Sequence, residues 1–138
     1  MSAEATALPD HVLSAILTLA KRKLESPQFA FRGHDFQLQE VFSDLSQTGA
    51  YPILNAFVFA SGGPEPYSPG LSESVSRLQL SGLIGRENPD YEVVFLQPAA
   101  EEFFNEVLQR EFTPEQIDQL QRVASVFIER VKVVSRSA

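Results

Sequence analysis

The sequence predicts an α+β domain that is mostly helical, with a small antiparallel sheet and a long C-terminal helix. Apolar residues recur at three- and four-residue spacing through most of the chain, which is the period of helices that bury one face. Two strand-like runs separated by a turn follow one another at 83–96. The 138 residues, 43% hydrophobic and 21% charged, suit one folded domain, which we place at 8–138 behind a disordered leader at 1–7.

Composition excludes several classes of site. Cysteine is absent, which excludes disulfides, cysteine-ligated zinc, iron–sulfur clusters and thiol catalysis, and fits a reducing cytoplasm. The first residues lack a basic segment followed by a long apolar stretch, and the apolar runs elsewhere are short, so we expect neither a secretory signal nor a membrane span. These features predict a cytoplasmic protein.

The first predicted helix covers 9–25. Its apolar residues recur every three or four positions, and Pro9 suits the first turn because its missing N–H would have no helical partner there. Pro27 ends the helix, since the residue before a proline avoids helical backbone angles. The segment around Phe31 and Gly33 is expected to be a linker.

A second helix is expected at 35–48, where an apolar stripe is followed by Gly49, a residue that favours helix ends. Residues 51–60 are dense in β-branched and aromatic types, which favours a strand; a short helix from Pro52 is the alternative. A glycine- and proline-rich turn at 61–66 separates this segment from the next helix.

The third helix, expected at 69–81, has a well-marked start. Ser68 is a favoured N-cap and Pro69 a favoured first residue. One buried stripe is predicted on this helix, made of Leu71, Val75 and Leu78. Gly82 then permits a left-handed turn into a hairpin at 83–96.

Two further helices complete the chain. Pro98 opens a short one, and Thr113 with Gln116 forms a capping box before a long helix at 114 to about 134. Its apolar residues alternate at spacings of three and four, like a coiled-coil seam: Ile117, Leu120, Ala124, Phe127, Val131 and Val134. Packing against the helix at 9–25 and pairing with a second copy in a homodimer both explain this seam.

The order of elements at 67–96 supports a resemblance. Tyr67-Ser68-Pro69 opens a helix, Gly82-Leu83-Ile84 leads out of it, and the segment from Tyr91 to Leu96 supplies a second strand. This resembles the recognition helix and wing of winged-helix proteins, and it implies a winged-helix-like core. It implies no particular ligand, since one fold hosts many functions.

A second resemblance covers residues 35–97. There, Gly63-Pro64 precedes Tyr67-Ser68 with two residues between them, and the helix that follows ends at Gly82. This is similar to the YwgA-like bacterial proteins and, more distantly, to the SocA-like (Panacea) antitoxin domain, in which a glycine-proline-tyrosine/valine-serine element stands before such a helix. The resemblance implies a bacterial protein-binding module of antitoxin or adaptor type, and it carries over no catalytic residue.

The outer face of the third helix and the hairpin form the predicted partner-binding surface. Its candidate residues are Tyr67, Glu73, Ser76, Arg77, Leu80 and Arg86. Across 66–97, two arginines stand against four acidic residues, a net charge of −2, whereas phosphate contacts need positive charge. Arg77 could reach a guanine edge, but we expect a solvated arginine that pairs with Glu73 four residues earlier.

No residue set indicates an enzyme, a metal or a cofactor. His11 and His34 have no metal-site spacing and are expected to be exposed or capping. Glu101 and Glu102 are adjacent, so they diverge by about 100° on a helix. The basic run 21–23 complements a helix C-terminus, and phosphate binding is the alternative. We therefore predict a non-catalytic protein-interaction module, with a DNA-binding regulator, dimeric through the C-terminal helix, as the alternative.

Overall fold

The computed structural model describes residues 8–24, 30–32, 35–59, 67–87 and 93–130, so the leader predicted at 1–7 lies outside its description. In chain order the elements are α1 (Pro9–Leu24), β1 (Ala30–Arg32), α2 (Asp35–Gln47), η1 (Pro52–Ala56), α3 (Pro69–Leu80), β2 (Ile84–Glu87), β3 (Val93–Leu96), α4 (Pro98–Phe103), η2 (Phe104–Leu108), α5 (Gln109–Glu111) and α6 (Pro114–Arg130). The chain is therefore mostly helical with a small antiparallel sheet, which confirms the predicted α+β class.

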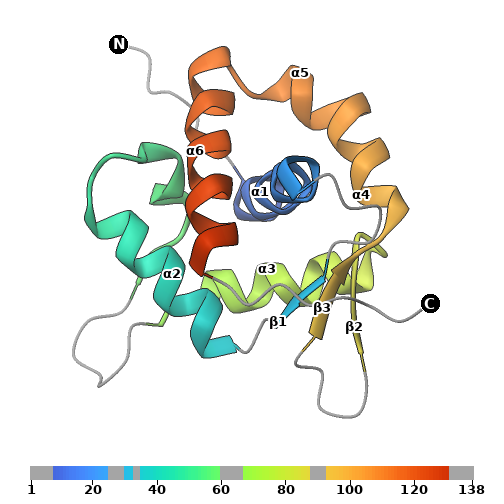
Figure 1. The fold of residues 1–138 in the computed structure, drawn as a ribbon, viewed down its shortest axis with the longest axis horizontal. Coiled ribbons are helices and arrows are strands. Elements are labelled where there is room, and N and C mark those ends of the chain that lie inside the picture. Colours follow the sequence, from blue (N-terminus) through green and yellow to red (C-terminus); the bar gives the residue numbers. More distant parts are fainter. Residues whose placement is uncertain (1–7, 25–29, 33–34, 60–66, 88–92, 131–138) are drawn as a thin grey trace.

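Helix α1 is the centre of the fold, seen nearly end-on in Figure 1 with the other helices around it. Every residue from Val12 to Ala20 is buried, so this helix is covered on all sides over about two and a half turns. It packs against α6, α3, η2, η1 and α4. The core is thus a ring of elements around one helix rather than two facing layers.

The sheet has three strands in the order β1-β3-β2, all antiparallel neighbours. Ile84 pairs with Leu96 and Glu87 with Val93, which confirms the predicted hairpin; its turn at 88–92 lies outside the described residues. Gly82, at a φ of 80°, provides the expected left-handed turn from α3 into β2.

The linker expected around Phe31 is wrong. Ala30–Arg32 forms β1 and pairs with β3, with Ala30 opposite Phe95. A three-residue strand is too short to show an alternating pattern, so only its pairing with a distant strand reveals it.

The strand predicted at 51–60 is also wrong. The alternative, a short helix that begins at Pro52, is confirmed: Pro52–Ala56 is η1, a 3₁₀ helix, which is wound more tightly than an α-helix. Leu54 N–H donates to the Tyr51 carbonyl at 2.9 Å and Phe57 N–H to the Leu54 carbonyl at 3.0 Å. Ile53 and Leu54 in η1 and Phe57 after it are buried in the core, so these residue types reflect burial rather than pairing in a sheet.

The remaining helix signals agree with the structure. The predicted capping box is present, with Thr113 N–H donating to Gln116 Oε1 at 2.9 Å and Gln116 N–H to Thr113 Oγ1 at 3.1 Å. The helix that opens at Pro98 runs through α4, η2 and α5 to Glu111, with η2 as a π-helical segment. Helix α6 follows to Arg130.

The seam of α6 faces its own chain. Leu120, Ala124 and Phe127 are fully buried, and Ile117 packs against the same core. The Phe127 ring meets the Phe42 ring edge-on, with centroids 6.1 Å apart. Of the two explanations for the seam, packing against α1 accounts for these residues, while Val131 and Val134 lie outside the described part of the chain.

Candidate partner-binding site

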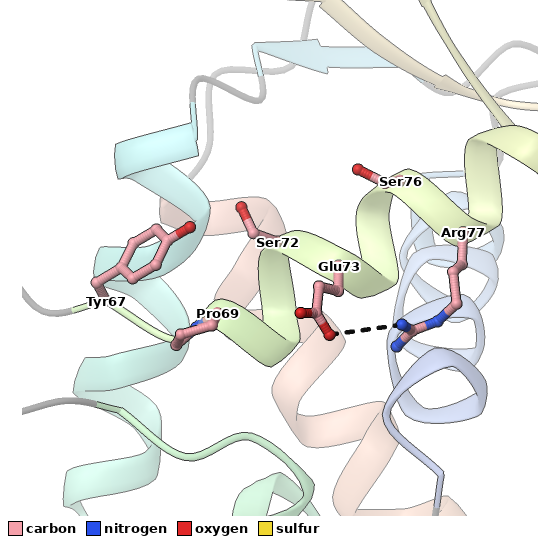
Figure 2. Close-up of a pocket in the computed structure, with 6 residues that line it drawn as sticks. All are labelled: Tyr67, Pro69, Ser72, Glu73, Ser76 and Arg77. Carbon is pink, nitrogen blue, oxygen red and sulfur yellow. Dashed lines mark ion pairs between the residues drawn. The ribbon is translucent and has the colours of Figure 1, made fainter.

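Four of the six predicted partner-binding residues lie around one shallow hollow on the outer face of α3. Tyr67, Glu73, Ser76 and Arg77 line it, together with Pro69 and Ser72, and its volume is about 340 Å³ (Figure 2). The hydroxyl groups of Ser72 and Ser76 project from the same side of the helix, and the Tyr67 ring lies beside its first turn.

The start of α3 is fixed by a buried amide on α2. Gln39, only 2% exposed, donates from Nε2 to the Ser68 carbonyl at 3.0 Å and accepts from the Ser68 N–H at 2.6 Å. The Ser68 hydroxyl in turn accepts from the Leu71 N–H at 3.3 Å, which confirms the predicted N-cap. Gln39 therefore sets the position of Tyr67, which directly precedes this cap.

The buried stripe of α3 determines which side chains face outward. Leu71, Val75 and Leu78 are buried, as predicted from their spacing. The opposite face therefore points to solvent, and Leu80 at its end is 87% exposed. Its side chain is therefore accessible to a partner.

Arg77 is held by two elements. Its Nε lies 2.8 Å from Asp10 Oδ2 and its Nη2 lies 2.9 Å from Asp10 Oδ1. This bidentate ion pair joins α3 to the first turn of α1. The Ser74 hydroxyl donates to the same carboxylate at 2.7 Å. The predicted pair with Glu73 is confirmed, with 3.6 Å from Arg77 Nη1 to Glu73 Oε1.

These contacts shift the pKa values of both partners. Burial raises the pKa of Asp10, but hydrogen bonds from Arg77 and Ser74, with the positive charge of Arg77, outweigh it, so the net pKa is below the ordinary value. The hydrogen bond to Asp10 raises the pKa of Arg77. Asp10, Glu73 and Arg77 together carry a net charge of −1, so the hollow has no free positive charge to offer a phosphate.

Leu80 and Arg86 lie outside the hollow. Leu80 is on the last turn of α3, beyond Arg77. Arg86 is on β2, opposite Val94, and its side chain is not among those that the structure describes. The structure thus gathers the first four candidates and places Leu80 at the end of the same helix.

In the basic run at 21–23, Arg22 makes a structural contact. Arg22 Nε lies 3.0 Å from Glu101 Oε1, and its Nη2 donates to Asn105 Oδ1 at 2.7 Å. Its guanidinium also lies over the Phe104 ring, 4.7 Å from the centroid. Arg22 therefore fastens the end of α1 to the helical segment formed by α4 and η2. Sequence reasoning did not predict this role, because the contacts span about eighty residues.

The histidine expected to be exposed or capping is instead a packing residue. His11 is partly buried, with Nδ1 against the Glu111 carboxylate and its ring edge-on to Phe103 at 5.5 Å between centroids. His34 lies outside the described residues. Neither glutamate of the adjacent pair at 101–102 lies in the hollow on α3.

The described part of the chain contains no cluster of three or more acidic, histidine or cysteine side chains that could hold a metal ion. Within the same residues, no helix combines the length and apolarity that crossing a bilayer requires. No family model, curated protein or solved structure matches the chain. A functional hypothesis therefore depends on the geometry and charge of the α3 face.

Proposed function

We propose that this chain is a non-catalytic protein-interaction module of bacterial, cytoplasmic type, similar to an antitoxin or an adaptor, and that it binds a protein partner through the outer face of α3. One observation carries the proposal. The exposed face of α3 combines the accessible side chains of Leu80 and Tyr67 with a hydroxyl-rich hollow in which Arg77 is already neutralised. Tyrosine is enriched at protein interfaces, and an interface core has few free positive charges.

A winged-helix-like core is part of the same proposal. The order helix, strand, helix, helix, strand, strand in α1, β1, α2, α3, β2 and β3 supports it, and so does the sheet order β1-β3-β2. In this arrangement α3 is the helix that other proteins present to a ligand, and Gly82 turns it directly into the hairpin. The resemblance to antitoxin domains favours a protein as the ligand.

Site-directed photocrosslinking tests the proposal. A benzoylphenylalanine placed at Ser76, in the hollow, is compared with one at Gln121, which is exposed on α6. In a bacterial lysate we expect one dominant protein adduct from position 76 that is absent from position 121. An excess of unlabelled wild-type chain should suppress the adduct, whereas the Leu80→Asp variant should not, because a charge replaces its apolar anchor. Equal adducts at both positions would count against the proposal.

A DNA-binding regulator is the second candidate, because the same element order places α3 where winged-helix proteins read the major groove. The carboxylates of Asp10 and Glu73 oppose this function at the centre of the face. Duplex binding at low salt discriminates the two. Six to ten phosphate contacts would make the affinity fall about 10³- to 10⁵-fold between 50 and 200 mM salt. Duplex binding with such a salt dependence, weakened by Arg77→Ala, would favour the regulator.

A further inference from the structure

We propose that the hollow on α3 receives an arginine side chain from the partner protein. This inference rests on the proposed function, and it specifies the chemistry of the contact. The residues that line the hollow also distinguish protein binding from DNA binding, because a site that attracts a positively charged guanidinium repels a negatively charged phosphate. Three features of the described residues carry the inference: the neutralisation of Arg77, the surplus of acceptor atoms, and the shape of the lining.

The first feature is that Arg77 has no spare positive charge. Its Nε and Nη2 both bind the Asp10 carboxylate, and its Nη1 faces Glu73. Asp10 is itself oriented by the Ser74 hydroxyl, so the pair is held from both helices. A ligand anion at this position would have to displace Asp10 or approach two carboxylates, and both cost free energy.

The second feature is the set of acceptors that remains. The Glu73 carboxylate is 66% exposed, and only its Oε1 contacts Arg77, at a long 3.6 Å. The hydroxyls of Ser72 and Ser76 line the same hollow, and no other described residue forms a hydrogen bond with them. The Glu73 carboxylate and, from the other edge of α3, the Ser72 and Ser76 hydroxyl oxygens are acceptors that suit a guanidinium with its several N–H donors (Figure 2).

The third feature is the shape of the lining, which favours arginine over lysine. The half-exposed Tyr67 ring and the Pro69 ring give the hollow an apolar wall at its helix-start end (Figure 2). A guanidinium is planar, weakly hydrated and able to stack on such a wall while its N–H groups face Glu73, whereas an ammonium is a compact, strongly hydrated point charge. At about 340 Å³ the hollow is large enough to admit a guanidinium and its stem.

Titration with small probes tests this inference without knowledge of the partner. Acetyl-arginine amide, acetyl-citrulline amide and acetyl-glutamate amide are added to the ¹⁵N-labelled full chain, and amide shifts are followed by NMR. We expect saturable shifts at 67–77 with arginine only, with a dissociation constant on the order of 1–10 mM. Glu73→Gln should weaken this binding about fivefold, as the loss of one partly exposed ion pair implies.

Glu106→Gln is the matched control, because Glu106 is an exposed carboxylate on η2, away from the hollow. It should leave the arginine titration unchanged. Equal binding of citrulline or glutamate, or an arginine affinity unaffected by Glu73→Gln, would overturn the inference. If the adduct at Ser76 forms while arginine fails to bind, only this inference fails. If arginine binds and no adduct forms, the cation preference stands and the proposed protein partner does not.

Discussion

Replacing Gln39 with methionine should destabilise the chain by about 2–3 kcal/mol, because the buried Gln39 amide makes two hydrogen bonds with the Ser68 backbone. The volume is nearly conserved, so little cavity forms. The main cost is that the buried Ser68 N–H loses its hydrogen-bond partner, which destabilises the fold by about 1–3 kcal/mol. Loss of the bond to the Ser68 carbonyl costs less free energy, because this carbonyl still accepts a hydrogen bond from the Ser72 N–H at 3.3 Å.

Urea unfolding followed by far-UV circular dichroism measures this effect, since the chain has no tryptophan for fluorescence. Gln121→Met on α6 is the control. Gln121 is exposed and its side-chain amide forms no hydrogen bond with another described residue, so this change should stay within about 0.5 kcal/mol. Equal effects of the two substitutions would refute the reasoning that Gln39 holds the start of α3.

Gln39→Glu adds a pH dependence with a definite sign. The ionised carboxylate can accept from the Ser68 N–H but cannot donate to the Ser68 carbonyl, and it is buried. Burial therefore raises the folded-state pKa of the introduced carboxyl above its unfolded value. Relative to wild type, the variant should be nearly normal below the unfolded pKa and lose stability as pH rises through the folded pKa. A stability difference from wild type that is independent of pH would refute this.

The other predictions concern acid stability, the hairpin and the seam. Because the pKa of Asp10 is lower in the folded chain than in the unfolded chain, its ionised carboxylate stabilises the fold at pH values above the unfolded pKa. This stabilisation is lost as the pH falls through the folded-state pKa. In urea titrations from about pH 5 downward, Asp10→Asn should therefore lose less stability than the wild type does. Gly82→Ala should cost about 1 kcal/mol from its positive φ alone. Gly85→Ala should cost more, about 2–3 kcal/mol, because its Cβ would lie 2.3 Å from the Phe95 ring, and equal costs in thermal melts would contradict this comparison. Phe127→Ala should cost about 3–5 kcal/mol in urea at any protein concentration, whereas a concentration-dependent loss would indicate a dimer seam.

Local signals in the sequence predicted much of the fold. Ser68 and Pro69 start α3, and Gly82 ends it, because each has a conformational property that suits its place. The capping box at Thr113 and Gln116 is equally local. Such features depend on residues within a few positions of one another, so periodicity and capping rules are sufficient to find them.

The missed elements depend on distant partners. Strand β1 exists because Ala30–Arg32 lies against β3, more than sixty residues later. The residues of η1 were interpreted as a strand because burial and strand formation favour the same residue types. Ile53, Leu54 and Phe57 are all buried, at spacings that a two-residue alternation does not produce. Pro52, a residue favoured in the first turn of a helix, is the signal within the segment that supports the helical alternative.

The charge of the candidate site also depends on a contact between residues that are distant in sequence, and this contact bears directly on which ligand the site can bind. The sequence places Glu73 four residues before Arg77, which predicts their pairing, but it leaves the arginine partly free to contact a ligand. Asp10, 67 positions earlier, binds two of its nitrogens. A net charge summed along 66–97 omits this carboxylate and so understates how acidic the centre of the face is. The choice between a phosphate and a guanidinium as ligand therefore depends on the packing of α1 against α3.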